Sequence, residues 1–373
     1  MIRFGIIGCG NISINAHMAA FDKLKDKVKV SAVCDLDKDR AEKAAEILGA
    51  QRAFSDYREM VDYVDAVLIA LPHRLHYSVG MFFAEHKKHI LMEKPLCIKE
   101  SEALSLIAKT KEMNVKLMTA YPVRHWPEIK KLKEFMDDGM CGDVFQMTVY
   151  TDHYNPSRDT RGAWMNCKGL GGGQFFSHGC HYVDILLWFL GNPVSGTHMG
   201  TNRGTPWMDR EGTSHVVIKF EDGALGYHTG SWGAIGTTHK FKVDIYGTKG
   251  TLSYCTDGKN KEHIVFLKRV TPIEENPEVV WLPDEESVKV LWEKEASGKH
   301  SEGEIEHFVS CILNDLKPIT DGEISLQGLR VIWKMYEAEA QNTVADLRGL
   351  GLDERFCDKP LCKFDCDSEE AVY

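Results

Sequence analysis

The sequence predicts two domains: an α/β N-terminal domain built on a doubly wound parallel sheet, and an α+β C-terminal domain with a mostly antiparallel open sheet. The chain has 373 residues, more than one hydrophobic core usually holds. Short apolar runs alternate with helical patterns in the first third of the chain. Longer segments of alternating polarity follow, separated by turn residues. We therefore expect domains at 1–122 and 123–348, and a polar, peripheral tail at 349–373.

Each element of the first domain is predicted from this alternation. The apolar run over residues 2–7 ends in glycines, which is typical of a buried parallel strand. Strands are expected, in order, at 2–7, 28–34, 52–54, 66–71, 89–92 and 116–121. Helices are expected at 16–25, 37–48, from about 57, and at 76–85 and 101–113.

The second domain is predicted from strands that follow one another without intervening helices. After a helix at 128–138, strands are expected at 144–151, 194–203, 214–220, 224–231, 240–246 and 251–254. Glu221-Asp222-Gly223 is one of two turn signals between neighbouring strands. Helical patterns return at 303–314 and 326–343. Because an open sheet leaves one face to be covered, we expect a homodimer or homotetramer formed through the C-terminal sheet.

Composition limits the class of partner. The formal net charge is −10, which argues against nucleic acid and favours a small metabolite. No run approaches the roughly 20 apolar residues that cross a bilayer, and Met1 leads directly into the first strand without a signal-peptide core. The 11 cysteines are scattered, and the spacing of Cys357, Cys362 and Cys366 matches no zinc pattern. We expect a cytoplasmic protein that does not act at a membrane.

A glycine turn between the first strand and the first helix predicts a dinucleotide site. Gly8-Cys9-Gly10 stands where a pyrophosphate needs close approach to the backbone and a helix N-terminus, with Asn11 and Ile12 following. Asp35 ends the second strand, where a carboxylate would bind the ribose hydroxyls and repel a 2′-phosphate. The cofactor expected is NAD. A tight turn without a ligand is the alternative.

Glu93-Lys94-Pro95 lies at the carboxyl end of a parallel strand, where open α/β sheets bind ligands. A lysine held there beside a carboxylate can take part in proton transfer. Taken alone, the motif would be read as a surface ion pair before a loop.

The motif does not stand alone, because the sequence resembles the Gfo/Idh/MocA family of dehydrogenases, which includes glucose-fructose oxidoreductase and inositol dehydrogenase. The family's order and spacing are matched by the glycine turn, residues 71–76, Glu93-Lys94-Pro95, residues 121–127, and Gly171-Gly172-Gly173 leading to Gly179-x-His181. The resemblance implies an N-terminal Rossmann domain, a C-terminal open-sheet domain and a substrate cleft over the nicotinamide.

The resemblance also implies roles for individual residues. Lys94 and His181 are the implied catalytic residues. Cofactor contacts are expected from Gly8, Gly10, Asn11, Ile12, Asp35, Leu71, Pro72, His73, His76, Glu93, Lys94, Arg124 and Trp164. Substrate contacts are expected from Lys94, Tyr121, Asp152, His153, His178 and His181.

These groups suit the oxidation of a carbinol. Hydride transfer to a nicotinamide requires a base for the hydroxyl proton, and His181 can be that base near neutral pH. Lys94 would hydrogen-bond the same oxygen. The sequence departs from the family at Ser177, where many members carry an aspartate. Either Asp152 or Asp184 substitutes for that acid, or Lys94 and His181 suffice, or the redox step has been lost.

The function expected is that of an NAD(H)-dependent oxidoreductase that transfers hydride between the nicotinamide and a secondary hydroxyl of a sugar, sugar derivative or cyclitol. An NAD-dependent glycosidase that uses transient oxidation with no net redox is the alternative, and a non-enzymatic NAD sensor is a third hypothesis. His178 and His181, with His153 or Cys180, could hold zinc, but no complete ligand set is evident and no metal is expected.

Overall fold

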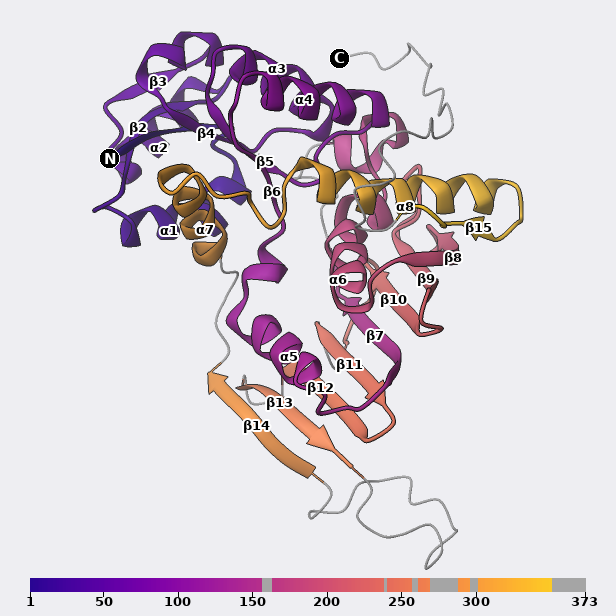
Figure 1. Ribbon diagram of the computed structural model, residues 1–373. Helices are drawn as coiled ribbons and strands as arrows, with labels where there is room; N and C mark the ends of the chain where they lie inside the picture. The colour runs from indigo at the N-terminus through magenta and orange to yellow at the C-terminus, as the bar shows by residue number, and fades with distance from the viewer. Residues whose placement is uncertain (156–162, 238–239, 257–260, 269–287, 296–300, 351–373) are drawn as a thin grey trace, which may run out of the picture.

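The computed structural model describes residues 1–155, 163–237, 240–256, 261–268, 288–295 and 301–350. These residues form a six-stranded parallel sheet and a nine-stranded, mostly antiparallel sheet (Figure 1). The two predicted sheet types are therefore confirmed. A short 3-10 helix, η4 (Pro122–His125), lies between the last strand of the first sheet and the first helix of the second domain.

The first sheet has the strand order β3-β2-β1-β4-β5-β6. Its strands are β1 (Ile2–Ile7), β2 (Val28–Cys34), β3 (Arg52–Phe54), β4 (Ala66–Ile69), β5 (His89–Glu93) and β6 (Leu117–Ala120). The order reverses between β1 and β4, so the loops after these strands diverge and leave a crevice at their carboxyl ends. This is the doubly wound arrangement that the alternating pattern predicts.

The helices of the first domain are α1 (Met18–Lys23), α2 (Lys38–Leu48), α3 (His76–Glu85) and α4 (Glu100–Glu112). Two of the predicted helices differ from the structure in bounds or in type. The helix expected over 16–25 begins earlier, as the π-helical segment η1 (Ser13–His17), with the Ser13 hydroxyl donating to the Gly8 carbonyl at 2.5 Å. The helix expected from Tyr57 is the 3-10 segment η2 (Tyr57–Tyr63).

The second sheet has the strand order β14-β13-β12-β11-β7-β10-β9-β8-β15. Its strands are β7 (Val144–Asp152), β8 (Pro193–Thr201), β9 (Thr213–Phe220), β10 (Leu225–Ser231), β11 (Lys242–Gly247), β12 (Gly250–Thr256), β13 (Lys261–Leu267), β14 (Val288–Glu295) and β15 (Ala345–Asp346). Only β7 and β10 pair in parallel. Three of these strands were not predicted. The charged residues of β13 and β14 hide the alternation of polarity, and β15 has only two residues.

Helices cover one face of this sheet. They are α5 (Pro127–Asp137), α6 (Cys180–Leu190) and α8 (Gly322–Ala340), and they share a hydrophobic core with the inward residues of β7, β9 and β11. The opposite face carries exposed apolar side chains, including Val217, Leu225 and Met199, which are 39%, 43% and 74% exposed. That face is the candidate surface for self-association.

The helix α7 (Glu302–Leu313) belongs spatially to the first sheet, although it follows the second sheet in the chain (Figure 1). Ile305, Phe308 and Val309 join the core formed by β1, β2 and α1. The Phe308 ring packs edge-on against Phe4, with ring centroids 6.2 Å apart. The chain thus returns to the first domain after completing most of the second sheet.

Within the described residues, no helix combines the length and the apolar composition needed to cross a membrane.

Candidate active site

The glycine turn leaves its backbone open to a ligand. Gly8 has φ of +90°, and a Cβ there would lie 2.2 Å from the carbonyl oxygen of Ala70, so only glycine fits. At Gly10, by contrast, an added Cβ would meet nothing within 4 Å. Asn11 is exposed and Ile12 is half-buried beside this space. A turn with an open backbone at a helix N-terminus fits a pyrophosphate group.

Asp35 is held against this turn. Its Oδ2 accepts a hydrogen bond from the Cys9 amide at 2.8 Å, and its Oδ1 accepts one from the Asp37 amide at 3.0 Å. Arg40, on the first turn of α2, lies 3.5 Å from the Asp35 carboxylate. The sequence analysis missed Arg40, which stands five positions after Asp35 rather than next to it. The second strand therefore ends in an acid with a cation beside it.

The loop after β4 is braced by two histidines. His76 is fully buried, and its ring nitrogens lie 2.8 Å from the Pro95 carbonyl and 2.9 Å from the Leu71 carbonyl. His73 Nδ1 donates to the Gly171 carbonyl at 2.9 Å. Burial lowers the pKa of both imidazoles. These contacts tie the half-buried Leu71-Pro72 segment to the lysine motif and to the glycine run of the second domain.

Lys94 connects the two domains at the carboxyl edge of the parallel sheet. Its Nζ donates to the Ser177 carbonyl at 2.9 Å, within the π-helical segment η7 (Phe175–Gly179) that precedes α6. Because η7 and α6 carry His178 and His181, this bond brings the motif lysine to the histidine segment of the second domain. The site therefore combines residues that are far apart in the sequence.

Glu93 precedes Lys94 and is buried. Burial alone would raise the pKa of its carboxyl group, but the hydrogen bond from His17 and the nearby charge of Lys94 lower the pKa to about 2. His17 Nε2 lies 2.7 Å from Glu93 Oε1. The carboxylate therefore stays ionised beside the lysine. His17 was not singled out from the sequence, where it is one of 16 histidines.

His181 is 8% exposed and faces Tyr121, whose ring centroid is 5.6 Å away. Tyr121 is buried, and burial raises the pKa of its phenol well above the usual value, so the phenol remains protonated at neutral pH. Ser177 is also buried, and it serves Lys94 through its backbone carbonyl. The side chain at position 177 supplies no carboxylate.

Asp184 is engaged in an ion pair. Its carboxylate oxygens accept hydrogen bonds from Arg124 at 2.6 and 2.8 Å, and both side chains are less than 5% exposed. The Arg124 guanidinium also lies over the Trp188 ring, 5.2 Å from its centroid. Arg124 of η4 is thus bound to Asp184 of α6. Of the acids considered in place of a residue-177 carboxylate, Asp184 already has a partner.

A group of histidines continues the site into the second domain. The His178 ring lies 5.2 Å from that of His153 and 6.0 Å from that of His181, centroid to centroid. Burial and neighbouring positive charge lower the pKa of His178 well below its usual range. Asp152 is paired in register with Ser231, and alternation along β7 places its side chain on the opposite face from Thr151 and Met147. The structure brings His153 and His178 together, but not Asp152.

No group of three or more histidine, cysteine or acidic side chains in the described residues has the arrangement of a metal site. Several residues from the sequence analysis lie outside what is described. The backbone of Trp164 belongs to the 3-10 segment η5 (Ala163–Asn166), but its side chain is not among the described parts. Cys357, Cys362 and Cys366 lie beyond residue 350.

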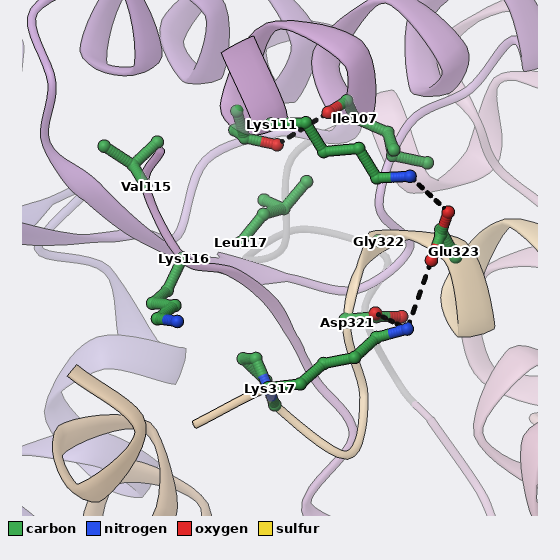
Figure 2. Close-up of a pocket in the computed structure, with 11 residues that line it drawn as sticks. Ile107, Lys111, Val115, Lys116, Leu117, Lys317, Asp321, Gly322 and Glu323 are labelled. Atoms are coloured by element: carbon green, nitrogen blue, oxygen red, sulfur yellow. Dashed lines mark hydrogen bonds and ion pairs between the residues drawn. The ribbon is translucent and has the colours of Figure 1, made fainter. Parts of the chain in front are cut away.

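A pocket elsewhere in the molecule is lined by the end of α4, the start of β6 and the start of α8 (Figure 2). Its charged side chains pair with one another: Lys111 with Glu323 at 2.5 Å, and Lys317 with Asp321 at 3.0 Å. It borders Leu117, the first residue of β6, whereas Glu93 ends β5. In a parallel sheet these are opposite edges, so this pocket is separate from the candidate site.

Two family models match the chain. The model described as the oxidoreductase family with an NAD-binding Rossmann fold matches residues 2–121. The GFO/IDH/MocA C-terminal domain matches residues 129–253. The matched segments correspond to the parallel sheet and to most of the second sheet.

Several of the relatives are sugar or cyclitol dehydrogenases. A myo-inositol 2-dehydrogenase of Thermotoga maritima is 28% identical over 67% of this chain and 74% of its own. A scyllo-inositol 2-dehydrogenase (NADP(+)) of Bacillus subtilis is 30% identical over 68% of this chain and 75% of its own. The solved structure of a levoglucosan dehydrogenase in complex with NADH superposes with a TM-score of 0.79, at 19% identity, over 93% of this chain and 99% of its own, and supports the fold.

Proposed function

Because this chain belongs to the Gfo/Idh/MocA family of oxidoreductases with an NAD-binding Rossmann fold, we propose that it is an NAD(H)-dependent dehydrogenase that oxidises a secondary hydroxyl of a sugar, sugar derivative or cyclitol. One observation carries the proposal: the hydrogen bond from Lys94 to the Ser177 carbonyl, which joins the lysine motif to the segment of His178 and His181. The named activities of the relatives support this substrate class.

The glycine turn and Asp35 would hold the cofactor. Gly8 and Gly10 would admit the pyrophosphate to the backbone, and Asp35 would accept hydrogen bonds from the ribose hydroxyls. Bound NAD supplies the hydride acceptor. We propose NAD rather than NADP because the carboxylate would repel a 2′-phosphate.

The proton is handled by Lys94 and His181. His181 would remove the hydroxyl proton as the carbinol is oxidised, and Lys94 would hydrogen-bond the same oxygen as negative charge develops there. Ionised Glu93 balances the lysine charge. With Asp184 paired to Arg124 and Asp152 on the other sheet face, we propose that Lys94 and His181 suffice without an acid at position 177.

The test is NAD reduction, followed by its near-ultraviolet absorbance, across a panel of sugars, sugar acids and cyclitols. With the best substrate, Lys94→Ala and His181→Ala should each lower kcat by about 100-fold or more, the size of a general acid or base contribution. Lys111→Ala, in the pocket of Figure 2, is the control and should leave kcat unchanged. Silence across the whole panel would contradict the proposal.

Because Ser177 supplies no carboxylate, we consider one alternative function. An NAD-dependent glycosidase would use the same site to oxidise a sugar transiently, with no net redox. Such an enzyme would release the aglycone from a chromogenic glycoside without accumulating NADH. Accumulation of NADH in step with substrate loss would exclude it.

Assembly and compartment are further parts of the proposal. We propose a homodimer or homotetramer formed through the exposed face of the second sheet, supported by its exposed apolar side chains. We also propose a cytoplasmic location. The eight cysteines among the described residues are all free thiols, which suits a reducing compartment.

A further inference from the structure

Three buried side chains from distant segments form a line: Glu304, His17 and Glu93. His17, at the end of η1, lies between two carboxylates: Nε2 is 2.7 Å from Glu93 Oε1, and Nδ1 is 3.6 Å from Glu304 Oε1. Glu304 belongs to α7 and is 0% exposed. Glu93 in turn accepts a hydrogen bond from the Lys94 backbone amide at 3.1 Å. The line therefore connects α7 to the catalytic lysine.

Glu304 is in a poor position for a negative charge. Within the described part of the chain, neither of its carboxyl oxygens has a hydrogen-bond partner, and the only ionisable groups acting on it are His17 and the like-charged Glu93. A buried carboxylate without donors costs far more free energy than the same carboxyl group in its protonated, neutral form. Burial and the charge of Glu93 accordingly raise the pKa of Glu304 well above 4.5.

The helix that carries Glu304 is fixed in place. The Ser301 hydroxyl donates to the Ala16 carbonyl, next to His17. Lys23 of α1 pairs with Glu302 at 2.5 Å, and Ile305 and Phe308 lie in the core of the first domain. Glu304 therefore cannot turn toward water without moving α7.

We propose that Glu304 is held protonated beside His17, and that Glu304 and His17 are positioning residues that keep Glu93 ionised beside Lys94. The two carboxyl groups compete for one imidazole. As long as the ring carries one proton, a protonated Glu304 lets that proton stay on Nε2 and be donated to Glu93, whereas an ionised Glu304 would favour the tautomer with the proton on Nδ1 and remove that hydrogen bond. The link to catalysis rests on the proposed function, because Lys94 acts on substrate only there.

The protonation state can be tested without turnover. The infrared spectrum of the wild-type apo protein at neutral pH should contain the carbonyl band of a protonated carboxyl group. Glu304→Gln should remove this band, whereas Glu302→Gln, at a partly exposed position on the same helix, should retain it. A band that survives Glu304→Gln, or its absence from the wild type, overturns the proposal.

A second measurement does not depend on any variant. Nitrogen NMR of the histidine-labelled wild-type protein should find a proton on Nε2 of His17 at neutral pH. A ring protonated at Nδ1 alone would overturn the inference, even if Glu304→Gln failed to fold.

The positioning role is tested by kinetics. His17→Phe should lower kcat between about 10-fold and 100-fold, the range expected when a reacting group is misplaced. It should also move the acidic limb of the pH profile to higher pH, because Glu93 loses the donor that lowers its pKa. His17→Gln, which can still donate, should restore much of the loss. An unchanged pH profile in His17→Phe contradicts the positioning role, while failure of the dehydrogenase assay leaves the infrared test to decide the protonation state.

Discussion

Asp35 illustrates how one side chain sets the preference of a binding site. Its carboxylate accepts from the Cys9 amide, so the acid that would face the ribose also fixes the glycine turn. Arg40 stands 3.5 Å from the same carboxylate. The carboxylate therefore lies directly against the turn, with the positive charge of Arg40 beside it.

Replacing Asp35 should invert this balance. Asp35→Ser removes the repulsion of a 2′-phosphate and frees Arg40, so the ratio of kcat/KM for NADP to that for NAD should rise about tenfold or more, since 1.4 kcal/mol corresponds to a factor of ten. Asp37→Ser, which removes a neighbouring charge but keeps a residue able to cap α2, should leave the ratio unchanged. Equal ratios in Asp35→Ser and the wild type would contradict the assignment.

Glu93 should make stability depend on acidic pH. Its pKa of about 2 in the folded protein lies below the usual 4.5, so the folded state releases the proton more readily than the unfolded chain. The resulting stabilisation is complete above pH 4.5 and is lost as the pH falls toward 2. The free energy of unfolding measured in urea should fall over this pH range more steeply for the wild type than for Glu93→Gln. Parallel curves would show that His17 and Lys94 do not stabilise the carboxylate.

At the scale of elements, the contact between η4 and α6 determines how the second domain meets the first. Arg124 follows the last strand of the parallel sheet, and Asp184 lies one turn after His181. Their buried pair fixes the helix that carries the histidine. Pairs of this kind are costly to break from one side, because the remaining charge has no partner.

Asp184→Asn should therefore destabilise the protein by about 3–5 kcal/mol in denaturant unfolding. Glu134→Gln, which breaks the exposed Lys131–Glu134 pair on α5, should cost about 0–1 kcal/mol. If Asp184→Asn abolished turnover with no loss of stability, Asp184 would be an acid of the reaction instead.

The elements also show how far the sequence predicts the site. The glycine turn, Asp35 and the lysine motif could be predicted because each lies at the end of a local strand pattern. The contact of Lys94 with Ser177 could be expected only from the family resemblance, since it joins two domains. The line from Glu304 through His17 to Glu93 could not be predicted, because it depends on α7 returning to the first sheet. The strands β13 and β14 were missed because charged residues such as Lys261 and Glu293 interrupt their apolar alternation.

At the scale of the whole molecule, the exposed face of the second sheet carries apolar side chains on neighbouring strands. Val217 and Tyr227 are paired in register across β9 and β10, and Leu225 lies two residues from Tyr227 on the same face. Such a face is suited to association of two copies of the chain, with the faces of their sheets packed against each other.

Charges placed on this face should dissociate the assembly. The double variant Val217→Glu with Leu225→Glu should have the mass of a monomer by light scattering, while the wild type has that of a dimer or tetramer. Leu104→Glu, at an exposed position on α4, should keep the wild-type mass. A monomeric wild type would refute assembly through the sheet.

The return of α7 to the first sheet has a consequence for synthesis on the ribosome. The parallel strands are complete when residue 120 has been made, but part of their hydrophobic covering is supplied by residues 302–313. The nascent first domain therefore carries an open apolar surface around Phe4 and Phe21 while most of the second domain is translated. Its fold can close only near the end of translation, so the two domains mature together rather than in succession.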